Sequence, residues 1–206
     1  MVSTSASSVA PESKLVQNAR GAVLLERIKA KLGSMLSEAA LSLGDVVVSV
    51  ERKHLLDVVK ILKLEAELQF NFLSSVTAVD WLDSRATRFE AVYHFVSQSH
   101  GFILRLKVPV PEEDCTIDSL VSLYGGANFM ERECWDMFGI SFKGHPDQRR
   151  VLMYDEFKGH PLKKDYPVQG KQPRIPLRAP EVQNTARDMN RPALFAINKR
   201  KTSGAV

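Results

Sequence analysis

The chain has 206 residues, of which 44% are hydrophobic and 25% charged, and its formal net charge is +4. This length and composition fit one globular domain with appendages, or two very small domains, with a sizeable core. Two cysteines are too few for a disulfide framework. No apolar run reaches the ~18 residues of a membrane-spanning helix. Disulfide-stapled modules and integral membrane proteins are therefore excluded.

The positive charge is concentrated at the C-terminal end. Residues 170–206 hold eight Lys or Arg and two acids, a balance of +6, which leaves −2 for the preceding residues. Nucleic-acid binding requires a basic patch on a folded surface or along one helix face, so no nucleic-acid partner is expected. The Ser-rich start lacks a basic region before an apolar stretch, and we interpret residues 1–13 as a disordered tail.

The first half of the chain predicts two helices and several strands. Apolar residues at helical spacing indicate a helix from Lys14 to Ala40, with Gly21 and Gly33 as weak points. A β-branched run predicts a strand over residues 45–50, and a wide apolar face predicts a helix over residues 55–62.

The following elements complete the predicted body. Residues 70–81 are expected to form a strand, and residues 88–96 and 103–108 a hairpin. Residues 116–123 are a candidate short helix capped by Thr116.

A helix is predicted from Phe129 to Phe138. Asn128 would cap its first turn together with Glu131, and Gly139 would end it. The bland interpretation of this helix is an amphipathic element that docks Trp135 and Phe138 in the core, with Cys134 as a buried thiol. No nucleotide-binding loop or nucleophile motif accompanies it, so a complete active site on this chain is not expected.

The pentapeptide FKGHP occurs twice, with its histidines at His145 and His160. Gly144 and Gly159 can adopt positive φ, and a residue before proline is pushed toward an extended backbone. Two histidines are too few for a metal site, although Asp147 and Asp155 could add carboxylates. We therefore interpret each Gly-His-Pro as a rigid bend whose imidazole bonds to a backbone carbonyl or a carboxylate.

Seven prolines between residues 144 and 192 exclude a long helix or a central strand there. The sequence thus predicts an α+β fold, with a small mixed sheet, flanking helices and an extended Pro-rich C-terminal arm. The expected parts are a body at 14–143, a partner-binding segment at 144–169, which we call the signature segment, and a basic tail at 170–206.

The motifs Glu131–Gly139, Gly144–Arg150 and Gly159–Pro167 together closely resemble the signature of the C-type subunit of NADH–quinone oxidoreductase. This is the thirty-kilodalton-type subunit of respiratory complex I. Gln148 and Lys163 depart from the usual Leu and Arg of that signature, and Lys163 loses the bidentate fork of an arginine. The resemblance covers most of the chain before Gly170, and nothing is carried over onto the tail.

The resemblance implies a peripheral-arm subunit that takes part in electron transfer from NADH to quinone coupled to ion translocation. The chain is similar to subunits that bind no flavin and no iron–sulfur cluster; by this resemblance, FMN, the clusters and the quinone belong to the rest of the complex. The expected partner is the D-type subunit, which forms the quinone pocket. The residues expected to contact it are Glu131, Arg132, Trp135, Asp136, His145, Arg149, Arg150, His160, Lys163, Lys164 and Asp165.

Three alternatives remain open at this point. The same subunit type occurs in membrane-bound hydrogenases and in ferredoxin-dependent dehydrogenases, and a stand-alone metal-dependent enzyme would use His145 and His160. The expected location is the cytoplasmic side of a bacterial inner membrane, with the mitochondrial matrix side as the alternative.

Overall fold

The computed structural model describes the backbone of residues 11–173 and the side chains from residue 19 onward. The described residues up to Gln172 belong to one compact unit. The first ten residues of the predicted N-terminal tail, and the predicted basic tail beyond Pro173, lie outside the described residues. Helix α1 begins at Pro11, inside the range expected to be a tail.

The described residues form three α-helices and seven strands. In chain order they are α1 (Pro11–Leu32), β1 (Leu36–Ser42), β2 (Asp45–Val50), α2 (Leu55–Leu64), β3 (Phe72–Asp80), β4 (Phe89–Ser97), β5 (Phe102–Val110), β6 (Thr116–Asp118), α3 (Ala127–Phe138) and β7 (Ser141–Lys143), with short 3-10 turns at Gly33–Met35 and Arg52–His54.

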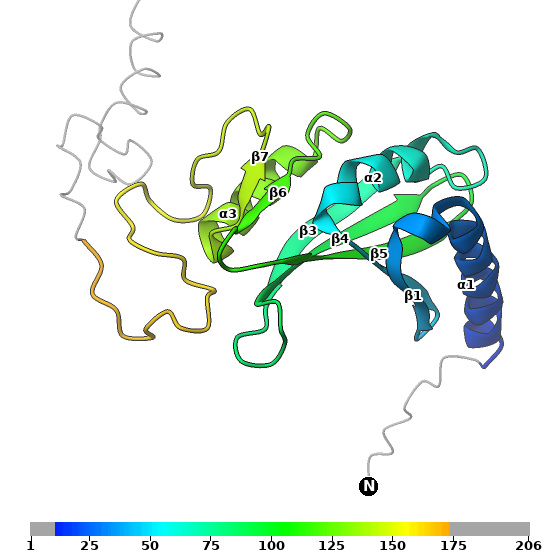
Figure 1. Cartoon of the computed structure of the whole chain (residues 1–206), viewed down its shortest axis with the longest axis horizontal. Helices are drawn as coiled ribbons and strands as arrows, with labels where there is room; N and C mark the ends of the chain where they lie inside the picture. The colour runs from blue at the N-terminus through cyan, green and yellow to red at the C-terminus, as the bar shows by residue number, and fades with distance from the viewer. Residues whose placement is uncertain (1–10, 174–206) are drawn as a thin grey trace, which may run out of the picture. The chain divides into compact units, whose positions relative to one another are not determined.

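The main sheet has five strands in the order β1-β2-β5-β4-β3. Strands β2 and β5 pair in parallel and all other neighbours are antiparallel, so the predicted mixed sheet and α+β class are confirmed. The predicted hairpin is also confirmed, because β4 and β5 pair from Phe89↔Val110 to Ser97↔Phe102. Strands β6 and β7 form a separate two-stranded parallel sheet next to α3 (Figure 1).

One face of the main sheet is buried beneath the helices. Alternate residues of β2 and β5, such as Val46, Val48, Leu104 and Leu106, are at most 1% exposed. This period of two is the pattern of strands with one buried face. The apolar side of α2 joins the same cluster through residues such as Val58. The opposite face of the sheet carries polar residues.

The prediction of a helix from Lys14 to Ala40 is wrong beyond Leu32. Residues Leu36–Ser42 form β1, which pairs antiparallel with β2. The sequence of β1, LSEAALS, consists of residues with ordinary helix propensity. Its pairing with β2 is fixed by the two-residue turn Leu43-Gly44, in which both residues have positive φ, the geometry of a type I′ hairpin.

The short helix predicted over residues 116–123 is also wrong. Residues Thr116–Asp118 form β6, which pairs in parallel with β7. Strand β7 lies about 25 residues further along the chain, beyond α3. A parallel neighbour at that distance leaves no local sequence pattern.

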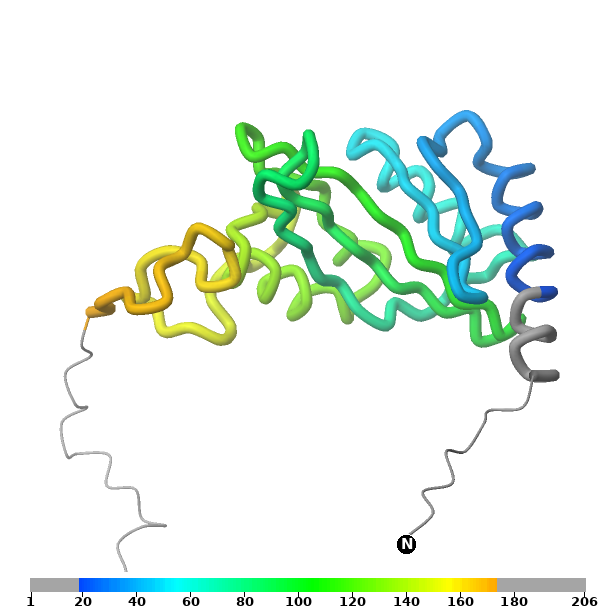
Figure 2. The backbone as a smooth tube through the Cα atoms, turned by 90° about the horizontal axis from the view of Figure 1, so that it is seen from below, coloured from blue at the N-terminus to red at the C-terminus, as the bar shows by residue number. Residues whose placement is uncertain are grey.

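The predicted capping of α3 by Asn128 is wrong as well. The helix begins at Ala127 after Gly126, with no side-chain cap. Its predicted end is confirmed, because Gly139 has φ of 80° and donates its backbone N–H to the carbonyl of Trp135. From Gly144 onward the described chain consists of turns and bends. Figure 2 shows this part, in yellow to orange, beside α3 and away from α1.

Helix α1 passes close to the β1–β2 turn at Gly21. A Cβ atom there would lie 2.5 Å from Leu41 Cδ1 and 2.9 Å from the backbone oxygen of Gly44, whereas a Cβ at Gly33 would meet nothing within 4 Å. We predict that Gly21→Ala lowers the free energy of unfolding by about 1–3 kcal/mol through overpacking. The matched variant Gly33→Ala should leave it unchanged or slightly higher. Denaturant unfolding of both variants checks this, and equal effects would contradict it.

Candidate functional site

Helix α3 buries three charged side chains toward the loops around it. Glu131, Arg132 and Asp136 are 0%, 8% and 0% exposed. Buried charges are costly unless they are paired or hydrogen bonded. Each of the three therefore marks a contact on which the local structure depends.

Glu131 joins α3 to the loop that follows β6. Its carboxylate accepts hydrogen bonds from the Ser119 hydroxyl at 2.6 Å and from the Leu120 amide at 2.7 Å. Burial raises the pKa of Glu131 from its ordinary value of 4.5 to about 7, while the two hydrogen bonds act in the opposite direction. Glu131 thus braces a distant loop in place of the predicted capping role.

Asp136 organises the loop between the two FKGHP copies. Its Oδ2 accepts the amides of Val151, Leu152 and Met153 at 3.1, 2.9 and 2.9 Å, and its Oδ1 accepts Arg150 Nη1 at 2.5 Å. Burial alone would raise the pKa of Asp136, but these four donors outweigh it and lower the pKa.

Arg150 in turn donates to two carbonyls further along the chain, those of Phe157 at 2.8 Å and Gly159 at 3.1 Å. The guanidinium therefore closes the loop between the two FKGHP copies. Arg132 holds the same loop from the other side, through Nε to the carbonyl of Arg149 at 3.1 Å and Nη2 to that of Arg150 at 3.2 Å.

The two Gly-His-Pro bends fasten the chain to α3. Gly144 and Gly159 have φ of 80° and 90°. The ring of His145 donates through Nε2 to the carbonyl of Asn128 at 3.1 Å, and that of His160 through Nδ1 to the carbonyl of Asp136 at 3.0 Å. The conformational interpretation of the repeat is thus confirmed: one bend is fixed to the first turn of α3 and the other to its last turn.

Trp135 and Gly139 complete the contact at the second bend. Trp135 is half-buried instead of lying in the core, with its ring edge-on to that of His160 at 6.3 Å between centroids. A Cβ at Gly139 would lie 2.8 Å from His160 Cδ2. Gly139 is therefore required twice, for its positive φ and for the close approach of the imidazole. Phe138 and Cys134 are buried as predicted, and burial raises the pKa of the Cys134 thiol.

A second cluster is centred on Arg88, which is not among the predicted site residues. Its guanidinium donates to Asp80 at 3.1 Å through both Nε and Nη2, to Asp165 Oδ1 at 2.6 Å, and to Glu112. Asp80 also accepts the backbone N–H of Lys164 at 2.9 Å. The only local signal is an acid and a base that flank the connection between two predicted strands, an arrangement that is common on protein surfaces.

The predicted site residues thus fall into two groups. Most of them make contacts within the chain, with Lys163 lying over the Phe89 ring at 5.4 Å. Arg149 and Lys164 have exposed side chains; Arg149 is 70% exposed and pairs with Asp147 at 2.9 Å. Five large apolar side chains of α3 and the signature segment are exposed as well. Four of them are Phe129, Val151, Leu152 and Leu162, at 66%, 38%, 55% and 53% exposed, and we call these four the signature surface.

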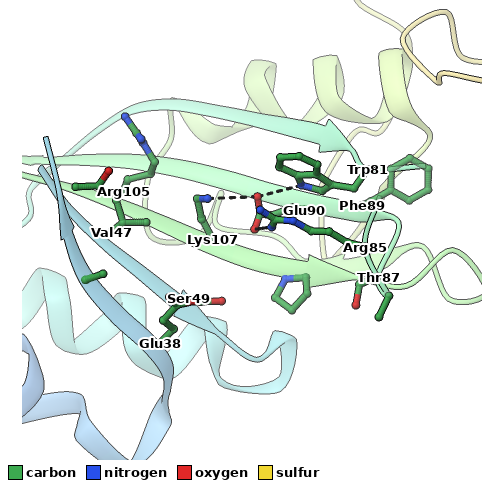
Figure 3. A pocket seen from close by; sticks show the side chains of 14 residues that line it. Glu38, Val47, Ser49, Trp81, Arg85, Thr87, Phe89, Glu90, Arg105 and Lys107 are labelled. Carbon is green, nitrogen blue, oxygen red and sulfur yellow. Dashed lines mark hydrogen bonds and ion pairs between the residues drawn. The ribbon is translucent and has the colours of Figure 1, made fainter. Parts of the chain in front are cut away.

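A separate hollow of about 550 Å³ lies on the open face of the main sheet (Figure 3). At its centre Glu90 accepts a hydrogen bond from Trp81 Nε1 at 3.3 Å and pairs with Arg85 at 3.0 Å and Lys107 at 3.6 Å. The Arg85 guanidinium also stacks on the Trp81 ring at 3.8 Å. Because Glu90 is satisfied by three donors, this hollow shows a self-contained charge network.

His145 and His160 do not converge on one point, since they bind opposite turns of α3. Within residues 11–173, no group of three or more His, Cys, Asp or Glu is placed to hold a metal ion. In the same part of the chain, no helix has the length and apolar character needed to cross a membrane.

The family model described as "Respiratory-chain NADH dehydrogenase, 30 Kd subunit" matches residues 48–172. The matched range contains the second half of β2, strands β3 to β5, helix α3, both Gly-His-Pro bends and the Arg88 cluster. The chain belongs to this family of respiratory-complex subunits.

Curated relatives define the particular subunit. The C-type subunit of NADH-quinone oxidoreductase from Citrifermentans bemidjiense is 42% identical over 76% of this chain and 93% of its own length. Its counterpart from Geobacter sulfurreducens is 42% identical over 70% of this chain and 88% of its own length. The chain is therefore a subunit of NADH-quinone oxidoreductase, the complex I-type respiratory enzyme.

Two solved structures are also similar to this chain. A trypsin-resistant fragment of Nqo5 matches with a TM-score of 0.54 and 36% identity, over 62% of this chain and 98% of the fragment. A chain of the membrane-bound sulfane sulfur reductase, an archaeal respiratory membrane complex, matches with a TM-score of 0.64 over 73% of this chain and 87% of its own, at 22% identity. The second match shows a shared fold alone.

The raised pKa of Glu131 predicts a specific pH dependence of stability. Between about pH 4.5 and 7 the folded chain retains a proton that the unfolded chain releases, so the free energy of unfolding falls as the pH rises through this window. Glu131→Gln should remove up to about 3 kcal/mol of this fall. Denaturant unfolding at several pH values measures it. Glu133→Gln, an exposed change on the same helix, is the control; identical profiles for both variants and the native chain would contradict the prediction.

The two adjacent arginines should differ sharply in their effect on stability. Arg150→Ala leaves the buried Asp136 carboxylate without its cation, which should lower the free energy of unfolding by about 3 kcal/mol. Arg149→Ala removes an exposed side chain and should change it by less than about 0.5 kcal/mol. Thermal and denaturant unfolding of the two variants test this contrast, which fails if both lose stability equally.

Proposed function

We propose that this chain is a peripheral-arm subunit of a proton-translocating NADH–quinone oxidoreductase that supports electron transfer by holding the adjacent D-type subunit of the quinone pocket. The observation that carries the proposal is the signature surface, Phe129, Val151, Leu152 and Leu162. Four large apolar side chains are exposed on elements whose backbone is fixed from beneath. Exposed apolar groups on a rigid base are typical of contact surfaces between proteins.

The charges beneath this surface favour binding without large rearrangement. Leu152 lies two residues after Arg150, which pairs with Asp136, and the amide of Leu152 donates to the same Asp136 carboxylate. Leu162 donates its amide to the carbonyl of Met137, the penultimate residue of α3. A preorganised surface loses less conformational freedom on association, which favours affinity.

In this proposal the chain itself holds no electron carrier. An iron–sulfur cluster held by thiolates uses four cysteines. Cys134 is buried in the core and Cys115 is half-buried, and burial raises the pKa of both thiols, which disfavours the thiolate form that binds metal. FMN, iron–sulfur clusters and quinone would belong to other subunits of the complex.

The proposed location is the cytoplasmic side of a bacterial inner membrane, with association through the rest of the complex. The named relatives are bacterial, which favours this location over the mitochondrial matrix side. A place in a hydrogenase or a ferredoxin-dependent complex is supported less well, because the likeness to the sulfane sulfur reductase chain concerns the fold alone.

The signature surface can be tested with matched surface variants. Leu152→Ser and Leu162→Ser should each lower assembly with the quinone-pocket subunit about tenfold, as expected for an apolar interface centre. NADH–quinone activity should fall in parallel. Native gels and co-purification of the complex measure assembly, and activity is read on the same membranes.

Ile103→Ser is the control, because Ile103 is 50% exposed on the open sheet face, close to the 53% of Leu162. It should leave assembly unchanged. All three variants should fold with native stability, since exposed side chains contribute little to it. Full assembly of both leucine variants would overturn the proposal.

A further inference from the structure

Arg88 connects three parts of the chain that are distant in sequence. It immediately precedes β4, and its carboxylate partners are Asp80 at the end of β3, Glu112 after β5, and Asp165 in the signature segment. The Arg88 side chain is 8% exposed and that of Asp80 is 2% exposed, whereas Asp165 and Glu112 are 55% and 56% exposed. The Arg88–Asp80 pair thus belongs to the body, and the other two acids reach it from the surface.

The cluster connects parts of the chain to one another and is not a ligand site. The Nε and both Nη atoms of the guanidinium already donate to carboxylates. Three carboxylates against one guanidinium give the cluster a net negative charge, which disfavours an anionic ligand. Four of the five N–H groups of the desolvated guanidinium thus bind carboxylates of the chain itself, so the arginine serves contacts within the chain.

The cluster acts on consecutive residues of the signature segment. Asp165 binds Arg88 directly, and the amide of Lys164 donates to the same Asp80 carboxylate that Arg88 holds. Lys163 lies over the ring of Phe89, the residue next to Arg88. With this side held, the half-exposed Leu162 and the exposed Lys164 side chain face outward from a backbone that cannot shift freely.

We infer that Arg88 is a positioning residue for partner binding: by holding Asp80 and Asp165 together, it fixes residues 162–165 in the conformation that the partner subunit meets. Its role in binding rests on the proposed function, whereas its role in local order does not. Ordering a segment before association removes part of the entropic cost of binding. Arg88 acts from beneath the surface and does not need to touch the partner.

Asp165 and Glu112 provide a matched pair of variants, because both acids bind the same guanidinium with nearly equal exposure. In the full-length chain, Asp165→Ala should speed amide hydrogen exchange of residues 162–165 by about three- to tenfold, the effect of losing one charged hydrogen bond. Glu112→Ala should leave exchange there unchanged. Asp165→Glu keeps the charge and should restore most of the protection.

Arg88→Lys, a buried change, should loosen residues 162–165 as Asp165→Ala does. Both should lower assembly of the complex on native gels by about the same factor, while Glu112→Ala assembles normally.

If neither Arg88→Lys nor Asp165→Ala changes the exchange, the positioning role is wrong whatever happens to assembly. Loosening with normal assembly would overturn both the positioning of a partner contact and the docking of this segment. Equal loosening by Glu112→Ala, or an assembly defect in Asp165→Ala that is absent from Arg88→Lys, would also overturn the inference.

Discussion

The local structure around α3 depends on one buried carboxylate, that of Asp136. It is fully buried and accepts three consecutive backbone amides and one guanidinium. Residues 144–173 contain no helix or strand to satisfy their backbone groups. Donors at 151–153 would otherwise require water or a partner chain. The last turn of α3 thus takes the role that a neighbouring strand has elsewhere in the fold.

The two FKGHP copies attach the same irregular segment to α3. Each glycine provides a positive φ, each proline restricts the backbone around it, and each imidazole donates to a carbonyl at one end of the same helix. The repeat is therefore a device for laying an irregular chain along a twelve-residue helix. The Arg88 cluster performs the same task further on, with side chains from three loops. Such a surface combines irregular backbone with a rigid base, which suits contact with another protein.

Much of the body followed from its sequence, because strand and helix periodicities are local signals. The runs at β2 and α2 and the β4–β5 hairpin were all recognisable, as was the end of α3 at Gly139. The failures lie where pairing with another strand overrides or replaces the local pattern. Strand β1 is built from residues with ordinary helix propensity that its hairpin with β2 holds extended, and β6 exists only because the distant β7 returns beside it. Glu131 was taken for a cap, since its partners Ser119 and Leu120 cannot be inferred from spacing.

The same division applies to the candidate site. The sequence by itself determined the family signature and the rigid bends at His145 and His160, because glycine and proline restrict the backbone wherever they occur. It could not show which charged residues serve the fold and which face outward, since Arg149 and Arg150 are identical neighbours. Only the tertiary structure decided that Arg150 is paired with Asp136 and Arg149 is exposed, and that Asp80 and Arg88 belong to the site. The physical reason is that the free energy of a charge depends on its burial and its partner, which are properties of the folded chain.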